Sequence, residues 1–138
     1  MCDHCSCRQF RPIADLSAEH EVILGHAWQV AEGADADGDH ARALLVVLDD
    51  HVRKEELGLY PWLSQTGDLP DDVLARLEVE HVEVRSEIVE GRFDRRSYFA
   101  LAAHIEEEEM ELFPAAMFAF DDDEWDALEQ LLPSGDVA

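Results

Sequence analysis

Two patterns of histidine and glutamate each occur twice in the chain, and this repetition constrains the fold more than any other feature. The pattern Leu-x-x-Glu-His begins at Leu16 and again at Leu77. The pattern His-x3-Glu-Glu, with a leucine, an aromatic residue and a proline at offsets of eight, nine and ten, begins at His51 and again at His104. Because both halves hold the patterns in the same order, we expect two copies of one helical hairpin. A site shared by the copies would lie on their pseudo-twofold axis.

Helix signals dominate the rest of the sequence, and strand signals are nearly absent. Short connections between long helices favour antiparallel neighbours. We therefore predict an all-α fold, an antiparallel up-down four-helix bundle with a short C-terminal fifth helix. A chain of 138 residues supports one domain, with a Cys-containing tail over residues 1–12 and the bundle over residues 13–132. The predicted helices span residues 17–33, 39–62, 70–91, 94 to about 114, and 121–132.

The helix boundaries rest on residues with known preferences at helix ends. Ser17 is a candidate N-cap for the first helix, and Gly33 suits a left-handed position at its end. Pro61 is expected to kink or end the second helix, because proline lacks the backbone N–H that a helix interior uses. Asp94 is expected to start the fourth helix, which continues to about Pro114 or a little past it.

Each of the four long helices carries one histidine on its apolar face. On the third helix, for example, Leu74, Leu77, His81, Val84 and Ile88 follow one another at steps of three and four residues. A single histidine in such a position is usually a core residue with its hydrogen bonds satisfied. Four of them, with a glutamate one turn later on two of the helices, form a different pattern. The inward-facing set is His20, His51, Glu55, His81, His104 and Glu108.

This set predicts a metal centre. An unpaired buried carboxylate costs several kcal/mol, and no basic residue occupies the four apolar faces to offset Glu55 and Glu108. The His-x3-Glu spacing places the two side chains on one face, about 6 Å apart along the helix axis. Two such helices could hold a pair of metal ions about 3.5 to 4 Å apart, with the glutamates bridging them. The nitrogen-rich donor set suits iron, and less obviously manganese or zinc.

The complete pattern resembles hemerythrin and the bacterial hemerythrin-like, HHE cation-binding, domains. The resemblance covers about residues 13 to 132 and rests mainly on the paired HxxxEE-x2-L-aromatic-P elements. It implies a four-helix bundle with two iron ions in a non-haem centre that binds dioxygen or related small ligands such as peroxide or nitric oxide. By this resemblance the first helix supplies one ligand, the second and fourth a His and Glu pair each, and the third one ligand. These are, in order, His20, His51 with Glu55, His104 with Glu108, and His81.

One position departs from the oxygen-carrying hemerythrins, which have a second histidine four positions away on the third helix. Here Leu77 and Arg85 occupy the positions four before and four after His81. A seventh ligand would then be water or Glu78. An open position favours reaction with peroxide, and some hemerythrin-like proteins are associated with peroxide decomposition. We therefore keep a catalase-like or peroxidase-like activity as an enzymatic alternative to ligand binding alone.

Several other side chains are candidates for roles around the centre. Glu107 and Glu111 are candidate acceptors for imidazole N–H groups, whereas Glu106 and Glu109 are expected on the solvated face. Aromatic and aliphatic residues at helical spacing are more often core than pocket lining. The candidates for pocket lining are Trp28, Trp62, Phe99 and Ile105, and His26 and His40 are expected at the surface.

The N-terminal cysteines suggest a second class of function. Cys2, Cys5 and Cys7 form C-x2-C-x-C, an odd number that argues against a disulfide framework. They are either exposed thiols on a tail or, with His4, part of a small metal or redox site. In the second case the chain would be an iron-responsive or redox-responsive regulatory module whose tail contacts a partner.

The charge excludes other classes of partner. Lys and Arg number 10 against 33 Asp and Glu, which gives a net charge of −23, so binding to nucleic acid or to an anionic membrane is disfavoured. The longest apolar run has eight residues, too few to span a bilayer. The first residues lack a basic stretch followed by an apolar one, so we expect no signal peptide and a cytoplasmic location.

Overall fold

The computed structural model describes residues 11–120, 123 and 126. This part of the chain is helical and contains no strand, which confirms the all-α class. Two short π-helical segments, η2 and η3, interrupt the α-helices. The elements are α1 (Arg11–Ala31), α2 (Asp39–Lys54), η2 (Glu55–Leu59), α3 (Tyr60–Thr66), α4 (Asp71–Val89), α5 (Arg95–Glu107), η3 (Glu108–Leu112) and α6 (Phe113–Ala119).

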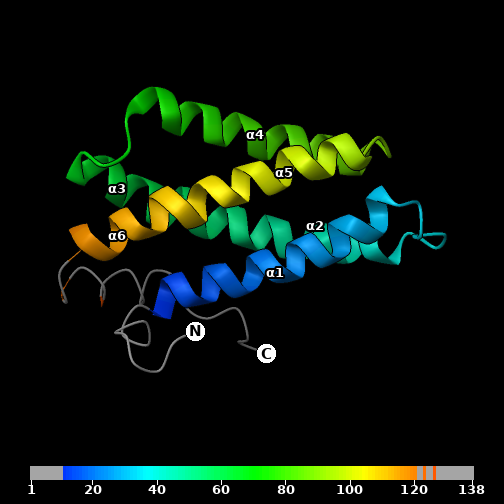
Figure 1. The fold of residues 1–138 in the computed structure, drawn as a ribbon, viewed down its shortest axis with the longest axis horizontal. Helices are drawn as coiled ribbons and strands as arrows, with labels where there is room; N and C mark the ends of the chain where they lie inside the picture. Colours follow the sequence, from blue (N-terminus) through cyan, green and yellow to red (C-terminus); the bar gives the residue numbers. More distant parts are fainter. Residues whose placement is uncertain (1–10, 121–122, 124–125, 127–138) are drawn as a thin grey trace.

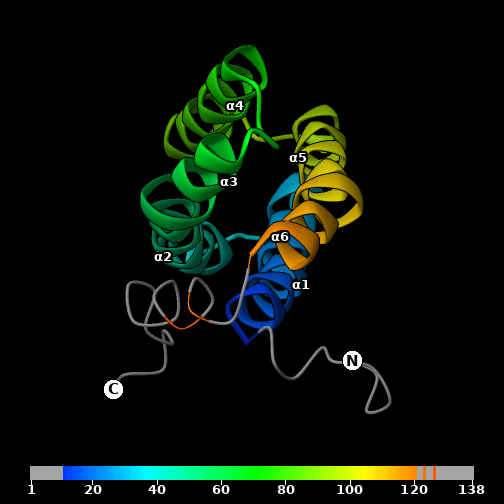
Figure 2. The same cartoon turned by 90° about the vertical axis from the view of Figure 1, so that its left-hand side faces the viewer.

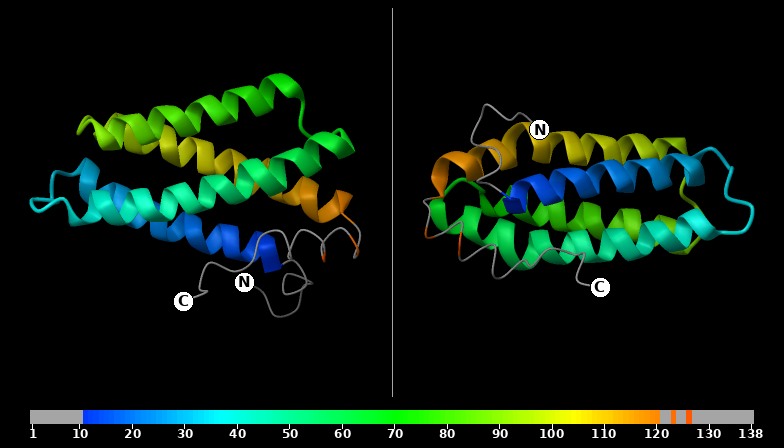
Figure 3. Two further views of the ribbon diagram at one scale, coloured as in Figure 1. Left: turned by 180° about the vertical axis from the view of Figure 1, so that it is seen from behind. Right: turned by 90° about the horizontal axis from the view of Figure 1, so that it is seen from below.

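These elements form four rods in a helical bundle. The segments α2, η2 and α3 continue one another as one rod, and α5, η3 and α6 form another (Figure 1). The chain turns back on itself at residues 32–38, 67–70 and 90–94 (Figure 1). Seen end-on, α1 and α4 lie at opposite corners of the bundle, and each contacts both α2 and α5 (Figure 2). The views from behind and below show the same four rods side by side (Figure 3).

The ends of most helices follow their local sequence signals. Gly33 has a φ of 75°, the left-handed conformation predicted for the end of the first helix. The second helix begins at Asp39 as predicted. Asp94 caps α5: its side chain accepts a hydrogen bond from the Ser97 backbone, and the Ser97 hydroxyl accepts one from the Asp94 backbone.

Two predicted boundaries are wrong. The first helix begins at Arg11 rather than at Ser17, and the Ser17 hydroxyl instead donates to Glu109 of the last rod, at 3.0 Å. Pro61 does not end its rod, which continues to Thr66. The rod containing Pro114 runs past this proline, as predicted, and ends at Ala119. Each proline is the second residue of the α-helix that follows a π segment, where a missing N–H costs little.

Two apolar clusters fill the bundle interior, and the histidines lie between them. One cluster includes Leu16, Leu59 and Leu77, and the other includes Ile23 and Leu48. On each rod, the histidine therefore separates side chains of one cluster from side chains of the other. The four histidines are at most 7% exposed. The predicted apolar faces are confirmed, and they place all four imidazoles in the middle of the core.

Two predictions fall on residues that the structure does not describe. The predicted helix over residues 121–132 lies, apart from Asp123 and Asp126, outside the described part of the chain, as do the three N-terminal cysteines. Among the described helices, none combines the length and the apolar character that crossing a membrane requires.

Candidate metal centre

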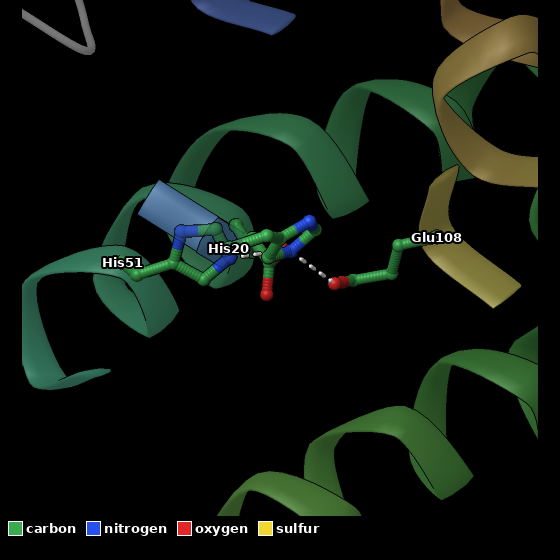
Figure 4. Close-up of side chains that lie close together, drawn as sticks. His20, His51 and Glu108 are labelled. Carbon is green, nitrogen blue, oxygen red and sulfur yellow. Dashed lines mark hydrogen bonds and ion pairs between the residues drawn. The ribbon is translucent and has the colours of Figure 1, made fainter. Parts of the chain in front are cut away.

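All six residues predicted as ligands meet in the centre of the bundle. Their donor atoms form two groups of four, and within each group the atoms lie within 4.8 Å of one another. Both groups contain Glu55 and Glu108, which are completely buried. Figure 4 shows His20 between His51 and Glu108, with its ring directed toward the Glu108 carboxylate. The groups are His20, His51, Glu55, Glu108 and Glu55, His81, His104, Glu108.

Glu55 spans the two groups with its two carboxylate oxygens. Oε2 lies 2.9 Å from Nε2 of His51 and 3.8 Å from Nε2 of His20. Oε1 lies 3.1 Å from Nε2 of His81, on the other side. One oxygen therefore faces each pair of imidazoles.

Glu108 spans the groups in the same way. Its Oε1 lies 3.0 Å from Nε2 of His20, and its Oε2 lies 3.6 Å from Nε2 of His104. Each group of donor atoms therefore consists of two imidazole nitrogens and one oxygen from each of two shared carboxylates. This donor set fits a pair of cations bridged by two carboxylates.

Each histidine also bonds a second glutamate, through Nδ1, the ring nitrogen on the side away from the centre. In every pair the imidazole Nδ1–H donates to a carboxylate oxygen, so Nε2 points toward the centre. Metal-bound histidines usually have such a partner, which fixes the tautomer and the ring orientation. The four pairs are His20–Glu109 at 2.6 Å, His51–Glu19 at 2.8 Å, His81–Glu56 at 2.7 Å and His104–Glu80 at 2.7 Å.

These supporting glutamates follow the sequence repeat. Within each hairpin, the glutamate that directly precedes the first histidine binds the second histidine. Glu19, for example, precedes His20 and binds His51. The glutamate after the shared carboxylate binds across to the other hairpin, as Glu109 binds His20. The repeat therefore contains the ligands together with the groups that orient them.

The prediction for the supporting glutamates on the last rod is wrong. Glu109, expected on the solvated face, binds His20, whereas Glu107 makes a bidentate ion pair with Arg76 at the surface. Glu111 is exposed, and Glu106 is exposed as predicted. The α-helical spacing on which the prediction rests ends at Glu108, where η3 begins, so the side chains that follow Glu108 point in other directions than expected. The repeated Glu-Glu dipeptide was the signal that could have identified Glu109.

The π segments bring an aromatic ring over one histidine in each half. The Tyr60 N–H bonds the Glu55 carbonyl, and the Phe113 N–H bonds the Glu108 carbonyl. This i to i+5 bonding places an aromatic residue on the face of the shared glutamate five positions earlier, and such π segments often mark functional sites. Tyr60 stacks on His81 with ring centroids 5.8 Å apart, and Phe113 stacks on His20 with centroids 5.5 Å apart.

The Tyr60 hydroxyl breaks the symmetry of the centre. It donates to Glu108 Oε2 at 2.5 Å and lies 3.3 Å from Glu55 Oε1 and 3.4 Å from His81 Nε2. Burial and the neighbouring Glu55 and Glu108 charges raise the pKa of Tyr60, so the phenol stays protonated. The sequence prediction had assigned no role to this hydroxyl and had considered Glu78 instead, which contributes to neither donor group.

The carboxylates make the centre a strong site for positive charge. Burial lowers the pKa of His20, but hydrogen bonds with Glu108 and Glu55 outweigh it and raise that pKa to about 9. Burial also lowers the pKa of His51, and Glu55 and Glu19 raise it to about 10. Burial raises the pKa of Glu55, but the neighbouring histidines hold it well below its usual range. Protons on the imidazoles therefore balance the carboxylates when no other cation is bound.

Two basic side chains support the outer glutamates. Lys54 is only 3% exposed and forms ion pairs with Glu19 and Asp50. Arg76 contacts Glu80 at 3.2 Å. The sequence predicts that no basic residue on the apolar faces offsets Glu55 and Glu108. Lys54 is buried beside Glu55 in the chain, but it compensates Glu19 and Asp50 rather than Glu55 or Glu108.

The other residues considered from the sequence lie mostly away from the centre. Ile105 lines it and is 6% exposed, whereas Trp28 and Phe99 are 38% and 61% exposed. His26 and His40, expected at the surface, are half-buried instead and face each other with their Nδ1 atoms 2.9 Å apart.

Comparison of the chain with protein-family models, with curated proteins and with solved structures found no match.

Proposed function

We propose that the chain is a non-haem di-iron protein that binds dioxygen or a related small ligand inside a helical bundle. The observation that carries the proposal is the position of Glu55 and Glu108, each with one oxygen toward either pair of histidines. Two buried carboxylates between two pairs of imidazoles are expensive to maintain without cations. Two metal ions offset that cost and use every donor atom.

The charge of the centre supports the binding of cations. Six carboxylates surround it, from the two shared glutamates and the four that hold the histidines. The basic side chains nearby, Lys54 and Arg76, each divide their charge between one of these six and a further carboxylate, Asp50 or Glu107. The centre therefore carries an excess of negative charge when the histidines are neutral. Because the ions replace protons on the histidines, metal binding would release protons at neutral pH.

The assignment to iron rests on the donor set and on the resemblance to hemerythrin-like domains. Imidazole with carboxylate suits iron, although it also accepts zinc and other divalent metals. An iron pair would supply reversible one-electron chemistry and affinity for dioxygen, peroxide and nitric oxide. The antiparallel up-down order of the four rods that this family implies agrees with the turns at residues 32–38, 67–70 and 90–94.

The side chains around the centre would each have a definite task. The histidines would hold the ions through Nε2, and their glutamate partners fix the rings. Apolar residues such as Ile23, Leu48 and Ile105 line the centre and exclude bulk water. The Tyr60 hydroxyl donates to Glu108 Oε2 and so holds this carboxylate oxygen in place on the His81 side.

The enzymatic alternative is turnover of peroxide. The third helix favours it, because Leu77 and Arg85 stand four positions from His81 where a second histidine would be needed, and a metal ion held there would have a position open to peroxide. Oxygen evolution from added peroxide measures this activity. Turnover no faster than that of free iron, and unchanged in His51→Ala, would leave ligand binding as the function.

The charge and the absence of a long apolar helix in the described part of the chain support a protein that works in the cytoplasm without nucleic acid or membrane. The experiment that tests the proposal is metal analysis of iron-loaded protein with visible spectra under nitrogen and then air. Two irons per chain and new oxygen-dependent absorption bands are expected. Less than one iron per chain, with no such bands, would contradict it.

A further inference from the structure

The two hairpins differ in the size of the side chains beside the centre. Aligning His51 with His104 matches Leu44 and Val47 of α2 to Ser97 and Ala100 of α5. In the first hairpin Leu44 is completely buried and packs in one apolar cluster with Ile23 and Leu48. In the second hairpin the smaller side chains of Ser97 and Ala100 line a cavity of about 210 Å³ between α4 and α5.

This cavity adjoins the metal centre. His81, Leu101 and His104 line both the cavity and the centre, so they form a common wall. The cavity therefore reaches the His81 and His104 pair from outside the bundle. The Tyr60 hydroxyl lies on this same side, 3.4 Å from His81 Nε2.

Acidic side chains determine which molecules the cavity can admit. Glu80, Glu83 and Glu87 line it. Aligning His20 with His81 matches Glu83 and Glu87 to Val22 and His26 of the first hairpin, so the second hairpin carries the excess of acid. A confined space with negative walls repels anions and leaves uncharged molecules unaffected.

We propose that small uncharged ligands reach the centre through the cavity between α4 and α5 and bind on the side of His81 and His104. The proposal rests on the proposed function and names the route and the side of that same site. Nitric oxide is the probe for an uncharged ligand, and azide is the probe for an anion of similar size.

The first test narrows the cavity. Ala100→Phe places a ring in it, and Ala100→Val copies Val47 of the first hairpin as a milder change. Ala103→Phe is the matched control, because Ala103 is exposed on the same helix and does not line the cavity. Stopped-flow mixing of iron-loaded protein with nitric oxide gives the binding rate. We expect about a tenfold slower rate for Ala100→Phe, equivalent to about 1.4 kcal/mol of added barrier, a smaller effect for Ala100→Val and none for the control.

The second test removes charge from the walls. In the double variant Glu83→Gln, Glu87→Gln we expect azide to bind severalfold faster at low salt, with the nitric oxide rate unchanged. The double variant Asp71→Asn, Asp72→Asn is the control, because it removes the same charge from the start of α4.

The outcomes separate the two proposals. Iron content is measured first for every variant. Wild-type protein with less than one iron per chain would overturn the proposed function and this inference together. Protein with two irons, in which Ala100→Phe binds nitric oxide as fast as Ala103→Phe, would overturn the cavity route alone. Equal azide rates in the two double variants would also contradict it.

Discussion

Replacing Glu109 by glutamine tests whether the glutamates bonded to the histidine Nδ1 atoms strengthen metal binding. The Glu109 carboxylate accepts hydrogen bonds from Nδ1 of His20 at 2.6 Å and from the Ser17 hydroxyl at 3.0 Å. Glu109→Gln keeps the size of the side chain and one acceptor oxygen, but it removes the negative charge. The His20 imidazole should then be a weaker base and a less firmly oriented ligand.

The size of the effect follows from the contact that is changed. A hydrogen bond to a charged group contributes about 1.5 to 3 kcal/mol, and a neutral one about 1 kcal/mol. The Glu109 side chain is 35% exposed, so solvent screening favours the lower half of this range. Subtracting the neutral bond from the lower half of the charged range leaves a loss of about 0.5 to 1.2 kcal/mol, which corresponds to roughly two- to eightfold weaker metal binding. This lies below the 10 to 100-fold effects known for such partners, as the exposure of Glu109 requires.

The assay is competition for ferrous iron against a coloured chelator under nitrogen at neutral pH. Glu56→Gln should weaken binding by a similar factor, because Glu56 holds His81 in the equivalent way at 2.7 Å. Glu106→Gln is the matched control, since Glu106 is exposed on α5. If Glu109→Gln and Glu106→Gln bound iron equally tightly, the supporting role of Glu109 would be refuted.

Three further predictions concern the groups around the centre, and a fourth concerns the N-terminal tail. The pKa of His51 is raised to about 10 in the folded protein against about 6.5 when unfolded. In the metal-free protein the contribution of this imidazole to the free energy of unfolding should therefore be complete below about pH 6.5 and be lost as the pH rises through about 10, which urea titration at several pH values measures. Tyr60→Phe should lower the free energy of unfolding of the metal-free protein by about 1 kcal/mol in urea titration, without loss of iron content. Lys54→Met should cost about 2 kcal/mol in the same assay, because it removes the ammonium partner of the partly buried Glu19 carboxylate and leaves His51 as its remaining partner. Deleting residues 1–9 should leave iron content and partner binding unchanged; a loss of either would favour the regulatory alternative.

The sequence was sufficient to place the six central residues because they obey ordinary helical spacing. His20, His51, His81 and His104 each continue an apolar face with a period of about 3.6 residues, and the i to i+4 glutamates share that phase. The two copies of the pattern then predicted that the halves would meet. Residues that follow a regular period and repeat twice leave few alternative arrangements.

The contacts that the sequence did not predict lie where this α-helical period ends. At Glu55 and Glu108 the chain adopts i to i+5 bonding, which moves Tyr60 into the centre and makes Glu109 a partner of His20. No local signal in the sequence distinguishes such a segment from an α-helix. The burial of Lys54 was also missed, because its partner Glu19 lies on another helix and becomes a neighbour only after folding.

The proposed function requires Glu55 and Glu108 to serve both iron ions. It is tested by iron analysis of the purified, iron-loaded chain beside Glu55→Gln and Glu108→Gln, with visible spectra recorded under nitrogen and then in air. We expect two irons in the parent chain, oxygen-dependent bands, and loss of both irons in either variant, because each carboxylate serves both groups of donors. Less than one iron in the parent chain, or variants that keep one iron firmly while losing the other, would contradict the shared bridge.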